Sequence, residues 1–163
     1  MRRFLAGGLA AILVLAAGVA CDDDNGTGND LETEFAATLT GAAERPTAVT
    51  TTASGTADVE IDDEDETITV TVNVTGLSNI TMAHIHVGNT STAGPIALTL
   101  TGVAVTGVFT GALVSNVVFT ADDVEGSETF DTLVAKIRSG QAYINVHTTA
   151  YPNGEIRGQL VAD

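Results

Sequence analysis

Apolar and polar residues alternate along most of the chain. In residues 66–77, written ETITVTVNVTGL, four branched apolar residues alternate with threonine and asparagine. Successive side chains of a strand point to opposite faces, so this run predicts a strand with one core face and one solvent face. Seven further runs have a similar pattern and predict strands at 34–39, 55–61, 82–87, 96–100, 103–109, 142–147 and 155–161.

One segment departs from this alternation. In residues 129–141, apolar residues recur at helical spacing, from Phe130 to Ile137, and Gly140 follows where a helix C-cap is expected. This predicts one short helix near 130–139. About eight strands with a single short helix favour an all-β fold, a Greek-key β-sandwich with an immunoglobulin-like or copper-zinc-dismutase-like layout.

The N-terminus has the organisation of an export signal. Three residues, Met1-Arg2-Arg3, precede an apolar run over 4–20 that stops at Cys21. The sequence AAGVAC resembles a bacterial lipobox, which predicts a signal peptide at 1–20 and a lipid on Cys21. An ordinary secretory signal cut near Ala20, or a signal anchor, is the alternative. The polar, acidic residues that follow predict a disordered tether at 21–32 and one domain at 33–163.

Charge excludes one class of partner. The chain has 6 basic and 21 acidic residues, and removing residues 1–20 leaves four basic and all 21 acidic ones, a formal charge of −17. Such a surface repels nucleic acid and anionic lipid headgroups. With Cys21 assigned to lipid, no thiol is left for a disulfide. The expected partners are therefore the membrane, through the lipid, and an envelope protein or ligand of unknown identity.

The three histidines form the main candidate site. His84 and His86 lie two residues apart in a predicted strand, so their imidazoles point to the same side. If the strand that holds His147 lies near, the three nitrogens suit copper or zinc, with one open coordination position. The alternative is structural, because strand histidines also bond to backbone groups or to polar neighbours, here Asn145, Thr148 and Thr149.

Enzyme chemistry has little support in the sequence. A His-x-His strand also occurs in copper-zinc superoxide dismutases, but their further histidines, zinc-ligand aspartate and disulfide cannot be assembled from this chain. No serine lies in a nucleophile-elbow pattern. The acidic run Asp62 to Glu66 lacks the glycine and the ligand spacing of a calcium loop, which favours a solvated turn between strands. A non-enzymatic protein is therefore expected.

Three segments carry a family resemblance. They are residues 39–61, residues 76–100 with AHIHVG, and residues 137–160 with YINVHTTAYPNGEIRGQ. Over 34–160 the chain is similar to the CHRD domain, a module named for chordin and found in bacterial secreted proteins. The resemblance implies a CHRD-domain lipoprotein of a bacterial cell envelope, acting as a non-enzymatic binding or structural module. A copper- or zinc-binding domain is the alternative.

A second group of residues is expected to be structural. Glu155 and Arg157 lie two apart on one strand, and Glu44 matches a glutamate in the Glu-x-Pro segment of the CHRD family. We predict that these three residues form a partly buried ion pair that fixes the strand register, in preference to a substrate site.

Overall fold

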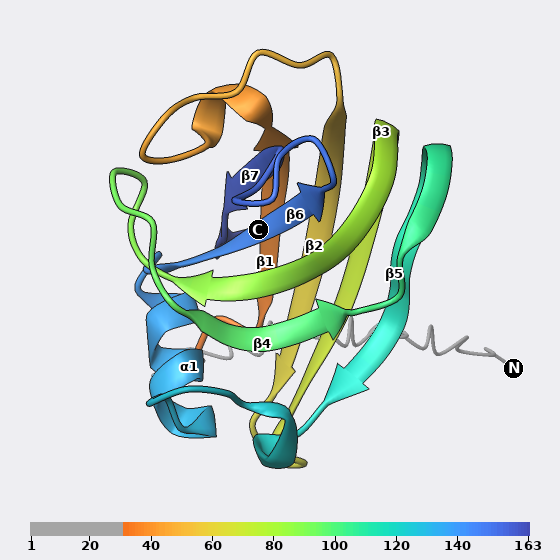
Figure 1. Cartoon of the computed structure of the whole chain (residues 1–163). Helices are drawn as coiled ribbons and strands as arrows, with labels where there is room; N and C mark the ends of the chain where they lie inside the picture. Colours follow the sequence, from red (N-terminus) through yellow and green to blue (C-terminus); the bar gives the residue numbers. More distant parts are fainter. Residues whose placement is uncertain (1–30) are drawn as a thin grey trace, which may run out of the picture. The chain divides into compact units, whose positions relative to one another are not determined.

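The computed structural model describes residues 31–163 (Figure 1). The predicted signal peptide at 1–20, Cys21 and the predicted tether up to residue 30 lie outside the described residues. Within 31–163 there are eight strands, one α-helix and two short 3-10 helices, so the all-β sandwich with one helix is confirmed. The strands are β1 (Glu34–Thr40), β2 (Ser54–Asp62), β3 (Thr67–Val87), β4 (Ile96–Thr101), β5 (Val105–Phe119), β6 (Ala142–Thr148), β7 (Ile156–Gln159) and β8 (Val161–Ala162).

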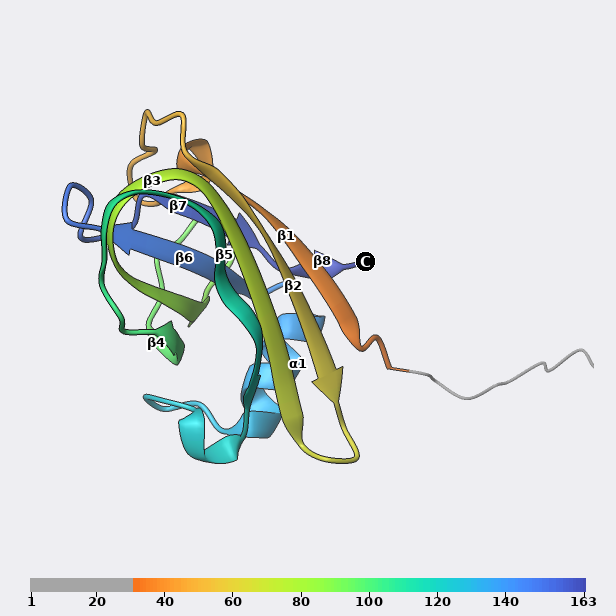
Figure 2. The same ribbon diagram turned by 90° about the vertical axis from the view of Figure 1, so that its right-hand side faces the viewer.

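Strand β3 belongs to both layers of the sandwich. Its first half pairs with β2 and β5, and its second half pairs with β6 and β4. Figure 2 shows β3 curving from one layer into the other. The prediction of separate strands at 66–77 and 82–87 was wrong, because the turn-like residues between them stay paired to β5. Gly76 and Asn79, with φ of 73° and 52°, bend the strand without ending it.

Strand β5 is also longer than predicted. The prediction ended at residue 109, whereas β5 continues to Phe119. Register shifts relative to β3 interrupt its alternation, and Gly111 and Asn116 have positive φ values of 144° and 49°. Such bulges hide a strand from a search for strict period two.

The C-terminal strands lie between strands from the N-terminal half. β6 pairs with β3, β7 pairs with β6, and β7 meets β1 at the pair Thr40–Arg157. This non-sequential order is typical of Greek-key connections. The predicted strand at 155–161 is divided at Leu160 into β7, which pairs with β6, and β8, which pairs with β1; Leu160 itself is fully buried and donates its N–H to the carbonyl of Ala142.

Helix α1 (Phe130–Arg138) packs against β6 and β8, and it buries Leu133, Val134 and Ile137 in the core shared by the two layers. It begins with a capping box between Thr129 and Thr132. It ends at Arg138, and Gly140 follows as the predicted capping glycine, with a φ of 66° and an N–H that donates to the carbonyl of Ile137. Among the described residues, no helix is long and apolar enough to span a membrane.

Candidate metal centre

The layer formed by β4, β6, β7 and the second half of β3 has a polar outer face, and that face is buried. On β3, β6 and β7 the apolar side chains point into the core, and the alternate positions point away from it. These outward residues are nonetheless mostly covered, because the segments 41–53, 88–95 and 149–155 contact them. The polar face, as we call it, comprises His84, His86, Tyr143, Asn145, His147, Arg157 and Gln159.

The polar face brings the three histidines together. Strand β6 lies beside β3, with His84 opposite Asn145 and His147 opposite Met82. One ligand nitrogen from each of His84, His86 and His147 lies within 4.8 Å of the other two. The side chains are only 2%, 8% and 6% exposed. The three imidazoles of the candidate site therefore lie together.

Backbone carbonyls orient two of the imidazoles. The Nδ1–H of His86 donates to Gly94 O at 2.9 Å, and the Nδ1–H of His147 donates to Pro152 O at 3.0 Å. In neutral rings this tautomer leaves both Nε2 atoms with a free lone pair. Nε2 of His147 faces Nδ1 of His84 at 3.0 Å, while the buried Nε2 of His86 has no hydrogen-bond partner among residues 31–163. Carbonyl partners of this kind orient metal-binding histidines.

The site favours neutral imidazoles. Burial lowers the pKa of all three histidines, and burial together with the neighbouring His147 and His86 lowers the pKa of His84 to about 4. A protonated ring would carry a charge into a poorly solvated space beside two other imidazoles. Near neutral pH the rings are therefore in the form that binds metals.

The polar neighbours proposed as structural partners of His147 bond to other residues. Asn145 Nδ2 donates to Glu44 Oε2 at 3.4 Å, and Thr148 Oγ1 donates to Glu155 Oε2 at 2.7 Å. The backbone N–H of Thr149 donates to Asn79 O. His147 has a structural bond, but it is to a carbonyl and leaves Nε2 facing the other histidines.

A stack of three side chains supports His86 from one side. The ring of Tyr143 lies parallel to that of His86, with centroids 5.0 Å apart, and the guanidinium of Arg157 lies 3.4 Å from the Tyr143 ring centroid. Arg157 also donates to the carbonyls of Asn89 and Thr92, and the N–H of Gly94 donates to the Tyr143 hydroxyl. The stack therefore holds the segment that supplies the carbonyl partner of His86.

The predicted ion pair of Glu44, Glu155 and Arg157 is not formed. Among residues 31–163 the salt bridge lies elsewhere, between Arg138 and Asp63. Arg157 is instead occupied by carbonyls and Tyr143, and the Glu155 carboxylate accepts from the hydroxyls of Thr51 and Thr148. All three residues are buried, but their partners differ from the predicted ones.

Glu44 is a buried carboxyl with an incomplete set of partners. It is 2% exposed, and neither its Oε1 nor Asn145 Oδ1 has a hydrogen-bond partner within the described part of the chain. Both atoms lie close to Gly154, where a Cβ would come within 2.3 Å of Asn145 Oδ1 and 2.7 Å of Glu44 Oε1. Burial, opposed by the charge of Arg157, raises the pKa of Glu44 to about 7.

A pocket of about 260 Å³ opens beside the histidines. His86 and His147 line it, together with Arg45, Gly94 and Pro152, which no sequence pattern marks as site residues. Tyr143 and Asn145 also line it, and they could have been found because they share a strand face with His147 at a spacing of two. The histidine cluster is thus reached from one side.

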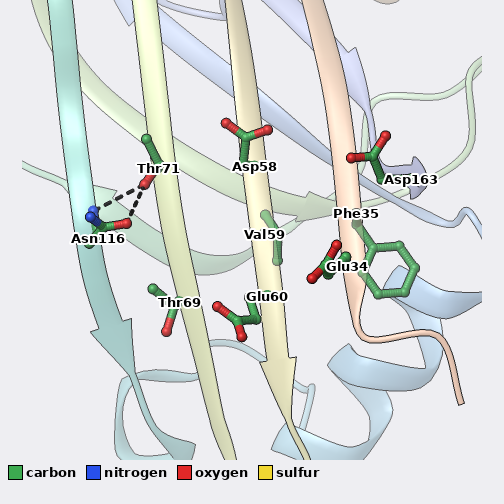
Figure 3. A pocket seen from close by; sticks show the side chains of 9 residues that line it. All are labelled: Glu34, Phe35, Asp58, Val59, Glu60, Thr69, Thr71, Asn116 and Asp163. Carbon is green, nitrogen blue, oxygen red and sulfur yellow. Dashed lines mark hydrogen bonds between the residues drawn. The ribbon is translucent and has the colours of Figure 1, made fainter. Parts of the chain in front are cut away.

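The acidic residues do not make a comparable site. In the turn at 62–66, Asp62 Oδ1 accepts from the N–H groups of Glu64 and Asp65. A shallow hollow of about 210 Å³ on the outer face of the other layer carries separated carboxylates (Figure 3). Over residues 31–163, the three histidines are the one group of three or more His, Cys, Asp or Glu side chains whose ligand atoms converge. The carboxylates of the hollow are Glu34, Asp58, Glu60 and Asp163.

Comparisons with known proteins give one match. The family model described as CHRD domain matches residues 35–160, which includes all three histidines and Glu44. No curated protein and no solved structure matched the chain.

Substitution Glu44→Gln is expected to stabilise the protein only at high pH. Since the pKa of Glu44 rises from 4.5 to about 7 on folding, the folded state binds the extra proton, and stability is lost as the pH rises through this interval. The free energy of unfolding of the variant should match wild type near pH 4 and exceed it by on the order of 2 kcal/mol at pH 8.

Denaturant unfolding at both pH values measures this difference. The matched control is Glu60→Gln, which removes a carboxylate from the exposed acidic face and so reports the effect of net charge alone. An equal stability difference at both pH values would contradict the assignment of Glu44 as a buried carboxyl whose pKa is raised by folding.

Proposed function

The chain belongs to the CHRD domain family, and we propose that it is a non-enzymatic domain that binds copper, or zinc, at His84, His86 and His147. The family suggests a binding or structural module and is not a known enzyme family. The proposal that the bound ligand is a metal ion is based on the geometry of the polar face. Capture or delivery of the ion is the role we propose, with no catalytic step.

One observation carries the proposal. In the described part of the chain the buried Nε2 of His86 has no hydrogen-bond partner, although the Nδ1 of the same ring is fixed by Gly94 O. A buried nitrogen acceptor without a donor costs free energy, so native proteins rarely keep one. A metal ion shared with His84 and His147 would satisfy this lone pair and would replace the hydrogen bond between those two rings.

Imidazole ligands and an open side favour copper over zinc. Imidazole suits both ions, and affinity for divalent ions rises to Cu²⁺ and falls again at Zn²⁺. A trigonal set with bonds of about 2.0 Å needs nitrogens roughly 3.5 Å apart, so the present spread of 4.8 Å requires only small ring movements. The pocket beside His86 and His147 leaves room for a fourth ligand.

The site is expected to work at the cell envelope. The export signal at 1–20 and the lipobox-like sequence ending at Cys21 support a lipid anchor, and the polar residues up to 32 support a tether. A tethered acidic domain would meet metal ions outside the cytoplasm. An envelope binding or structural module without metal is the second candidate, supported by the carbonyl bonds of His86 and His147.

Metal titration should give one bound ion per chain. We expect submicromolar affinity for Cu²⁺ by calorimetry and weaker affinity for Zn²⁺. Both His86→Ala and His147→Ala should weaken copper binding by about a hundredfold or more, because each removes a ligand. The control Glu60→Gln should bind as wild type, since it changes the acidic hollow instead.

Two results would count against the metal. If copper binding persists in both histidine variants but weakens in Glu60→Gln, the copper binds to the acidic surface and not to the histidines. Absence of binding, with the histidine variants merely less stable, would favour the second candidate, in which the imidazoles hold the covering segments in place.

Substitution Cys21→Ser is expected to release the protein from membranes. In a bacterial host, the wild type should sediment with the membrane fraction, and mass spectrometry of its N-terminus should find lipid on Cys21. The serine variant cannot receive the lipid and should lose this association. Membrane association that survives the substitution would indicate a signal anchor, and a free Cys21 at the mature N-terminus would indicate an ordinary secretory signal.

A further inference from the structure

We infer that a small anion binds the metal as fourth ligand, in the pocket beside His86 and His147, and that Arg45 holds it. This inference rests on the proposed metal site and deepens it, because it names the class of ligand that the bound ion recruits. The anion would bind through one oxygen or nitrogen atom, as a small carboxylate does.

The charge of the ligand set calls for an anion. Three neutral imidazoles would leave the charge of a divalent ion uncompensated in a buried site. Neither buried glutamate belongs to the converging set: Glu155 is bonded to two threonine hydroxyls, and Glu44 bonds to Asn145. Within residues 31–163 no carboxylate joins the three histidines, so the compensating charge in this proposal comes from a bound anion.

The pocket supplies the route and limits the size. His86 and His147 line it and His84 does not, so the open coordination position faces this side of the cluster. Its volume of about 260 Å³ is below the usual range for drug-sized ligands, which restricts it to a small molecule. The backbone of Gly94 and the side chain of Asn145 give it polar walls.

Arg45 is the cation placed to hold the anion. Its Nη1 donates to Glu44 O at 2.7 Å and to Ala42 O at 3.2 Å, which anchors the half-buried side chain at the wall of the pocket. Its other N–H groups form no hydrogen bond within residues 31–163, so they are available as donors. A guanidinium anchored in this way matches the geometry of carboxylates and similar anions.

The positive charge here is unusual for this chain. Residues 31–163 contain four basic residues; Arg45 lines the pocket beside the histidines, and Arg157 stacks on Tyr143, which in turn stacks on His86. Arg157 is occupied by two carbonyls and Tyr143. A local positive field on an acidic protein directs small anions to this pocket.

Azide titration of the copper-loaded protein tests the inference. Each protein is first loaded to one Cu²⁺ per chain, and sodium azide is then added while the azide-to-copper charge-transfer absorption is followed. We expect saturable binding of one azide. Arg45→Gln should weaken it by about tenfold or more, since it removes a hydrogen bond to a charged group. The matched control Arg138→Gln removes the same charge from the salt bridge with Asp63 and should bind azide as wild type.

Each outcome separates the two proposals. Copper loading with azide affinity reduced only in Arg45→Gln supports the inference. Copper loading with no azide binding, or with equal affinity in all three proteins, overturns the inference and leaves the metal site standing. Failure of the wild type to load copper overturns the proposed function, and the inference falls with it.

Discussion

Burial of a polar sheet face is the constraint on which the rest of this structure depends. Strands β3, β6 and β7 each direct polar side chains away from the core, where an ordinary two-layer sandwich would expose them to water. Here three segments cover that face, so its polar groups need partners within the protein. Backbone carbonyls of the covering segments supply many of these partners, for instance to Arg157, His86 and His147.

This constraint links the fold to the proposed site. Because carbonyls take the Nδ1–H groups of His86 and His147, the other side of each ring is directed toward the centre of the cluster. The Arg157–Tyr143–His86 stack fixes the segment at 88–95, and Arg45 lies on another covering segment beside the same pocket. The loops therefore complete a cluster whose three histidines are all carried by strands.

Much of this arrangement follows from the sequence. Period-two alternation predicts the strands, and a spacing of two predicts that His84 and His86 share a face. Alternation also predicts a solvent face, and there it misleads: all seven residues of β6 are buried, since loops cover what the pattern marks as exposed. The partners of His86, His147 and Arg157 are backbone carbonyls, which every residue has, so the sequence does not reveal them. Neither the histidine tautomers nor the partners of Arg157 could therefore be predicted. The continuity of β3 was hidden by turn-forming residues that stay paired.

Nitrogen-15 NMR of the imidazoles tests the central claim most directly, because it reports the tautomer of each ring and its response to metal. In the metal-free protein at neutral pH, our account predicts that His86 and His147 are neutral with the proton on Nδ1. One equivalent of diamagnetic Zn²⁺ should then shift the Nε2 resonances of both rings. Protonation at Nε2, doubly protonated rings, or Nε2 resonances that do not respond to zinc would contradict a histidine cluster built to bind a metal.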